Sequence, residues 1–191
     1  MSMFLIFVSA ALINNYVLTQ FLGLCPFFGT SKKLSTAVGM GLSVLFVMTI
    51  ASVATNIIYH QVLARFQMEY LQTIVFILII ASIVQFVEAY LKKSFKSLYD
   101  VLGIFLPLIT VNCTIMGVAL INVREQFTFI DAIVNSLGAG SGFLLALVLL
   151  AAIREKYDNH PGVPVLFRGF PLALFSAGLM NFGFMGFQGL I

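Results

Sequence analysis

The chain has 191 residues, of which 61% are hydrophobic and 9% are charged, and its net charge is +3. The length suits a single domain, and the composition excludes an ordinary water-soluble protein. No cluster of basic residues interleaved with aromatic ones points to nucleic acid as a partner.

The charges divide the chain into six uncharged runs, residues 1–31, 34–64, 70–87, 101–123, 132–153 and 169–191. A helix needs about 20 apolar residues to cross the hydrocarbon core, so each run predicts one spanning helix in the lipid bilayer. Backbone groups in lipid must bond within the chain, and runs of this length favour helices over barrel strands. We therefore predict an all-α integral membrane protein with six transmembrane helices, forming a single membrane domain over residues 1–191.

The basic residues predict how these helices are oriented. The odd-numbered connections hold eight of the ten: Lys32, Lys33, Lys92, Lys93, Lys96, Arg154, Lys156 and Arg168. Because Lys and Arg gather on the cytoplasmic side, both termini are expected on the outer, or periplasmic, side. The N-terminus lacks a basic n-region, so we expect no cleavable signal peptide.

The first run is too long for one straight helix. At 1.5 Å per residue it would extend about 46 Å, against a hydrocarbon core of about 30 Å. It contains Gly23-Leu-Cys25-Pro26, and proline removes an amide donor and restricts the residue before it. We predict two half-helices that meet near Cys25.

In the fourth run, Pro107 is expected to break the helix in the same way, six residues before Cys113. Both breaks should face inward, because free backbone groups in a membrane must be buried in protein.

The two halves of the chain, residues 1–95 and 96–191, would each contain three spans, so any repeat between them must be inverted. Phe21-Leu-Gly-Leu in the first half resembles Phe105-Leu-Pro-Leu in the second. Inverted repeats with broken helices place functional sites near the midplane. We therefore predict two inverted three-helix repeats, with helices 1 and 4 broken.

Cys25 and Cys113 are the only cysteines in the chain. Three roles are compatible with them: small buried hydrophobic residues, a disulfide, or ligands of a metal or iron–sulfur centre. Clusters usually take four thiolates, so a metal centre would need a partner that supplies two more. The absence of a Cys-x-x-Cys motif leaves all three roles open at this point.

Several polar residues interrupt the apolar runs. Asn14 and Asn15 are predicted to form hydrogen bonds between helices. Thr110 and Asn112 lie close to Cys113, where their side chains are candidates for hydrogen bonds to cluster sulfur.

Glu88 is predicted to pair with Lys92 four residues later, and the alternative is a role in an ion pathway. The glycines of the second, fifth and sixth runs are predicted to permit close helix approach.

Two motifs resemble a known family. Residues 21–33, which include Cys25-Pro26-Phe27, and residues 102–113, which end at Cys113, are similar to the RnfA family of Rnf complexes. The segment 167–187 is similar as well, so the resemblance extends over nearly the whole chain. The D and E subunits of the sodium-pumping NADH:quinone reductase are homologous to that family, and the Cys25-Pro26-Phe27 sequence favours Rnf.

The resemblance implies a multi-pass protein of the bacterial or archaeal cytoplasmic (inner) membrane. Such a protein pairs in inverted orientation with its homologue RnfE, beside the B, C, D and G subunits of the complex. It also implies that Cys25 and Cys113 supply half the ligands of one shared [2Fe–2S] cluster. The complex transfers electrons between reduced ferredoxin and NAD, coupled to sodium or proton transport, and this chain alone holds no complete active site.

Three other functions compete with this interpretation. One is the E subunit of a sodium-pumping NADH:quinone reductase. The others are a secondary transporter with incidental cysteines and a passive assembly protein.

Overall fold

The computed structural model describes residues 3–63, 69–94, 106–158 and 169–188, and every regular element in these ranges is helical. The elements follow one another in this order: α1 (Met3–Val8), η1 (Ser9–Ile13), α2 (Tyr16–Thr19), α3 (Leu24–Thr30), α4 (Leu34–Ile58), η2 (Tyr59–Leu63), η3 (Glu69–Leu71), α6 (Gln72–Ser94), α8 (Leu106–Thr110), α9 (Cys113–Arg124), α10 (Phe129–Asp158) and α11 (Phe170–Gln188). The prediction of an all-α protein is confirmed.

Four helical stretches are long and apolar enough to cross a membrane: Leu34–Gln61, Gln72–Tyr90, Pro107–Arg124 and Phe129–Tyr157. Two shorter apolar helices, Met3–Ile13 and Phe170–Gly186, occupy the first and sixth of the predicted runs. The chain is therefore a multi-pass membrane protein by the length and composition of its helices.

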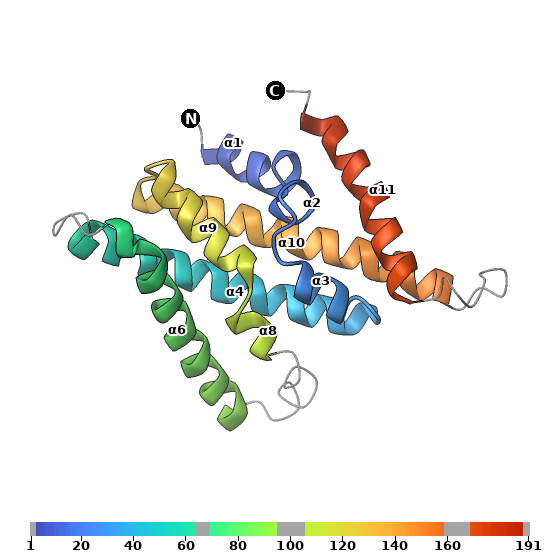
Figure 1. Ribbon diagram of the computed structural model, residues 1–191, viewed down its shortest axis with the longest axis horizontal. Helices are drawn as coiled ribbons and strands as arrows, with labels where there is room; N and C mark the ends of the chain where they lie inside the picture. Colours follow the sequence, from blue (N-terminus) through green and yellow to red (C-terminus); the bar gives the residue numbers. More distant parts are fainter. Residues whose placement is uncertain (1–2, 64–68, 95–105, 159–168, 189–191) are drawn as a thin grey trace.

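The centre of the molecule is the pair formed by α4 and α10, which pack against each other along their length (Figure 1). Glycines let the two backbones approach: a Cβ added at Gly140 would lie 2.9 Å from Leu45 Cγ, and one at Gly41 would collide with Leu144. The predicted role of the glycines is confirmed for these two helices.

The glycines of α11 behave differently. A Cβ added at Gly178, Gly183 or Gly186 would meet nothing within 4 Å. The prediction of close helix packing is therefore wrong for Gly183 and Gly186 within the described chain, and Gly189 lies outside the described residues. Figure 1 explains the difference, because α11 diverges from the central pair, as α6 does on the other side.

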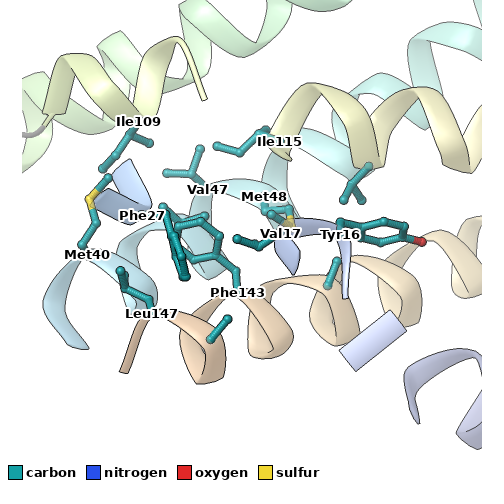
Figure 2. Packing of buried hydrophobic residues seen from close by; sticks show 14 of the residues in the cluster. Tyr16, Val17, Phe27, Met40, Val47, Met48, Ile109, Ile115, Phe143 and Leu147 are labelled. Carbon is teal, nitrogen blue, oxygen red and sulfur yellow. The ribbon is translucent and has the colours of Figure 1, made fainter. Parts of the chain in front are cut away.

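A buried apolar cluster joins the central helices to the short half-helix α3. Phe27 of α3 is completely buried with Met40 and Val47 of α4 and with Phe143 and Leu147 of α10 (Figure 2). This packing holds α3 against the centre of the molecule.

The first run is broken near Cys25, as predicted, and the break falls at Gly23. The helix α3 begins at Leu24, directly after Gly23, whose φ is +77°. Pro26 lies inside the first turn of α3, where its missing N–H has no intrahelical acceptor to lose. The part before the break is also not one half-helix. A further interruption at Asn14 and Asn15 separates α1 and η1, which are continuous, from α2.

In the fourth run the break lies at a different place from the one predicted. Pro107 is part of the short helix α8, which ends at Thr110, and α9 begins at Cys113. The interruption therefore lies at Val111 and Asn112, after the proline and directly before the cysteine.

Candidate metal centre

Both cysteines lie in the first turn of a helix that follows a break. Cys25 is the second residue of α3, and Cys113 is the first residue of α9. The first amides of a helix have no intrahelical acceptor and favour negative charge nearby. Sulfur ligands of a metal carry such charge, so both thiols are placed where it is tolerated.

The thiols are free, and both cysteines are exposed in the chain. Within this chain neither cysteine is a buried hydrophobic residue, and the two are not joined by a disulfide. The expectation of inward-facing breaks is met only in part: Gly23 and Asn112 are buried, whereas Phe21 and Val111 are exposed. The cysteines themselves remain accessible to another molecule.

The two breaks contact each other directly. The backbone N–H of Gly23 donates a hydrogen bond to Cys113 Sγ, with the nitrogen 2.9 Å from the sulfur. Cys25 follows Gly23 by two residues, a stretch of chain that spans at most about 7 Å. The cysteines, which are 88 positions apart in sequence (113 − 25), thus lie on two chain segments that contact each other.

Gly23 is required at this contact for two reasons. Its φ lies in the left-handed region, which residues with a Cβ rarely adopt. A Cβ would also collide with Thr114 Oγ1 and lie 3.1 Å from Asn112 Oδ1. The close approach of the two breaks therefore depends on the missing side chain.

Asn112 and Thr114 leave polar atoms unused beside Cys113. Asn112 Oδ1 accepts a hydrogen bond from the Thr114 backbone N–H at 3.0 Å, which caps α9. Asn112 Nδ2 and Thr114 Oγ1 are buried and have no partner among the described residues. Buried polar groups normally form hydrogen bonds. Two such groups without a partner on either side of a cysteine therefore fit a site where a bound group accepts hydrogen bonds from them.

The donor set is half of what a tetrahedral thiolate site needs. Within the described residues, no group of three or more His, Cys, Asp or Glu side chains is placed to hold a metal ion. Two accessible thiols on helix breaks that contact each other fit an iron–sulfur cluster only if another chain supplies the remaining ligands.

The predictions for Asn14 and Asn15 have different outcomes. Asn15 Nδ2 donates to Gly142 O at 2.9 Å, which joins α2 to α10, and the same side chain caps α2. The predicted interhelical bond is confirmed for Asn15. Asn14 Nδ2 donates to the nearby Ser9 Oγ at 3.1 Å instead, so this bond is local.

Two further predictions stay predictions. Glu88 is partly buried on α6, and both its pairing with Lys92 and its role in an ion pathway are untested. Thr110 ends α8, shortly before Cys113, and its expected bond to cluster sulfur is untested as well.

Sequence reasoning missed a buried chain of hydrogen bonds through four helices. Tyr16 donates to Asn135 Oδ1 at 3.3 Å, Asn135 Nδ2 to Asn122 Oδ1 at 2.7 Å, and Asn122 Nδ2 to Ser52 Oγ at 2.7 Å. These residues belong to α2, α10, α9 and α4 in turn. The only sign of this chain in the sequence is that single polar residues interrupt the apolar runs. Their hydrogen-bond partners cannot be predicted from it, because the partners are distant in sequence.

The position of Arg154 differs from the one that the charge pattern predicts. The pattern places it in the fifth connection, whereas it lies within α10 and is only 4% exposed. The prediction assumes that charges mark the ends of spans, and a buried guanidinium inside a helix violates that assumption.

A chain of apolar helices with two accessible thiols and exposed apolar faces is typical of a membrane component of a larger complex. The family described as Rnf-Nqr subunit, membrane protein, matches residues 3–191. The chain belongs to this family, as its two cysteine motifs predicted.

Relatives within the family are similar over their full length. The chain is 52% identical over 190 residues to the A subunit of the Na(+)-translocating ferredoxin:NAD(+) oxidoreductase complex of Acetobacterium woodii, covering 100% of this chain and 98% of that protein. It is 53% identical over 187 residues to the A subunit of the ion-translocating oxidoreductase complex of Thioalkalivibrio sulfidiphilus, covering 98% and 97%. The corresponding protein of Syntrophotalea carbinolica is 50% identical over 190 residues, covering 100% and 98%. The resemblance to the RnfA family is confirmed.

Proposed function

We propose that this chain is the A subunit of an ion-translocating ferredoxin:NAD oxidoreductase, and that Cys25 and Cys113 supply half the ligands of a [2Fe–2S] cluster inside the membrane. The observation that carries the proposal is the bond from the Gly23 N–H to Cys113 Sγ. It unites two broken helices, each with a thiol in its first turn. The full-length relatives with half of their residues identical are named as subunits of such complexes.

The second half of the ligands would come from the homologous RnfE, bound in inverted orientation. Accessible thiols in the single chain support a partner at this face. Phe21 and Val111 lie next to the two breaks and are 56% and 73% exposed, so a partner would also cover apolar surface there. The B, C, D and G subunits would complete the assembly.

The chemistry supplied by the cluster would be the acceptance and release of single electrons. The residues of this chain would hold and shield that centre. The amide of Gly23 would donate to one ligand sulfur, while Asn112 Nδ2 and Thr114 Oγ1 stand ready to donate beside it. The buried cluster around Phe27 would fix the half-helix that carries Cys25.

The proposed topology has six spans in a bacterial or archaeal cytoplasmic membrane, with both termini outside and inverted repeats over 1–95 and 96–191. The short apolar helices Met3–Ile13 and Phe170–Gly186 would belong to the first and last spans. In support, each half contains a short helix, a break, and a second helix that begins at a cysteine or one residue before it.

Electron paramagnetic resonance of the reduced, purified complex tests the proposal. Cys25→Ser and Cys113→Ser should each abolish one cluster signal while the complex still assembles. A matched control adds Ser82→Cys to the Cys25→Ser variant. The chain then has two cysteines again, but the new one lies at an exposed position of α6, so the signal should not return.

The alternatives predict other results. Unchanged signals with normal electron transfer in both serine variants would indicate a passive assembly protein. Unchanged signals together with intact solute uptake would indicate a secondary transporter.

A further inference from the structure

A buried arginine lies at the end of the half-helix that carries Cys25. Arg154 of α10 is 4% exposed, although it is a charged residue in a helix long and apolar enough to span a membrane. Burying a charge is costly unless the group is well bonded, and ionisable residues inside membrane spans are usually functional.

The guanidinium binds the C-terminal end of α3. Arg154 Nη1 donates to Phe28 O at 3.0 Å and to Ser31 Oγ at 2.7 Å. Ser31 is the C-cap residue of α3 and is completely buried. A cation at this position is favoured by the partial negative charge of the last carbonyls of a helix.

The two acceptors that the described residues offer to the guanidinium, Phe28 O and Ser31 Oγ, are both uncharged. Its Nε is buried without a hydrogen bond among the same residues. Neither acceptor carries a negative charge to offset that of the arginine.

The half-helix α3 links this charge to the cysteine. It has seven residues, so its length is about 10 Å at 1.5 Å per residue. Gly23 precedes it in a left-handed conformation, and Phe27 fixes its middle in the core. The orientation of α3, and with it the place of Cys25, thus depends on what holds its far end.

We propose that Arg154 is a positioning residue for the metal centre: it clamps α3 from its C-terminal end and supplies a buried positive charge that favours the reduced state. This inference rests on the proposed function. When one electron arrives from a reduced carrier of the complex, the centre becomes more negative by one charge. A fixed cation in a medium of low dielectric constant stabilises that state and raises the reduction potential.

The first experiment is a potentiometric titration of the membrane cluster in the purified complex, followed by its electron paramagnetic resonance signal. Arg154→Met should lower the midpoint potential, and Arg154→Lys, which keeps the charge, should restore most of the shift. Lys156→Met is the matched control, since it removes an exposed charge two residues away on the same helix, and it should leave the potential unchanged.

An unshifted potential in Arg154→Met, or an equal shift in Lys156→Met, would overturn the inference. If Arg154→Met does not assemble, Ser31→Ala removes one of the two bonds to the guanidinium and keeps the charge. Ser31→Ala should then broaden the resonance signal, and a signal identical to wild type would count against the clamp.

The second experiment does not need a cluster. In the complex with Cys113→Ser, the reaction rate of Cys25 with a membrane-permeant maleimide should rise several-fold when Arg154→Met is added. An unchanged rate would refute the clamp, even if the cysteines hold no iron. Conversely, a raised rate without any cluster signal in the wild-type complex would leave the clamp standing and refute the proposed function.

Discussion

At the scale of single residues, the site depends on a position without a side chain. Gly23 combines a left-handed φ with contact to both Thr114 and Asn112. An alanine there would be strained by about 1–3 kcal/mol before any collision is counted. The contact between the two breaks is therefore the feature most sensitive to a small substitution.

We expect Gly23→Ala to separate α3 from α9 and to remove most of the cluster from the assembled complex. Iron content and the amplitude of the resonance signal measure this loss. Gly178→Ala is the control, because a Cβ there meets nothing within 4 Å and the cluster should be retained. Full cluster content in Gly23→Ala would contradict the role of this contact.

The orphaned hydroxyl of Thr114 permits a test with almost no change in shape. Thr114→Val removes a buried group that has no partner among the described residues, so the protein should be no less stable. If the hydroxyl donates to the bound centre, its loss should lower the midpoint potential. A titration of the complex measures the shift, and a thermal melt that is equal to wild type excludes damage to the fold.

Residue patterns locate the break near Cys25 but place the second break at Pro107 instead of at Val111 and Asn112. Pro26 and Pro107 predict interrupted helices, yet each lies inside the first turn of one. The loss of an N–H has no cost there, so a proline marks a helix start as readily as a break. The breaks themselves depend on Gly23 and on the capping side chain of Asn112, and whether such residues cap or pack is decided by tertiary contacts.

At the scale of elements, the packing of α10 depends on which of its faces carry glycine. A Cβ at Gly142 would lie 2.7 Å from Ala11 O, so the helix contacts the backbone of η1 directly. The same stretch accepts the hydrogen bond from Asn15. The irregular first segment is thereby held against a continuous helix.

Gly142→Ala should force η1 away from α10 and destabilise the protein by roughly 1–3 kcal/mol, the usual cost of overpacking. Thermal unfolding of the complex in detergent, followed on this chain, measures the effect. Gly183→Ala, at an open position of α11, should melt like wild type. Equal stability of the two variants would mean that η1 can move away from α10 without a loss in the free energy of unfolding.

The existence of the long helices is predictable because apolar length and charge boundaries are local properties of the sequence. The division of residues 3–30 into four short helices cannot be predicted in this way, since a tilted helix, a kinked helix and a series of irregular turns all fit one apolar run. The burial of Arg154 is likewise hidden in the sequence, because its acceptors lie 126 and 123 positions away.

At the scale of the whole molecule, a large apolar surface lies outside the core. Leu174, Phe175 and Phe182 on α11 are more than half exposed, as are Ile74 and Phe86 on α6. Lipid or neighbouring proteins must cover these helices, which diverge from the centre in Figure 1. The cysteines are also exposed in the single chain.

Assembly should therefore change the reactivity of the cysteines. In membranes that contain this chain alone, Cys25 and Cys113 should react readily with a permeant maleimide, and in the whole complex they should react several-fold more slowly until it is denatured. Lys93→Cys, at an exposed position on α6, gives a reference thiol that should react in both samples. Equal labelling of the native cysteines with and without partners would show that nothing covers them.

The amide of Gly23 also makes the two sulfur atoms unlike each other. Cys113 Sγ already shares electron density with an N–H group, and Cys25 has no such donor that the described part of the chain shows. A thiolate that accepts a hydrogen bond donates less charge to iron than one that does not. A metal held by both cysteines would therefore have unequal ligands, and the backbone amide of a single glycine would be the source of that asymmetry.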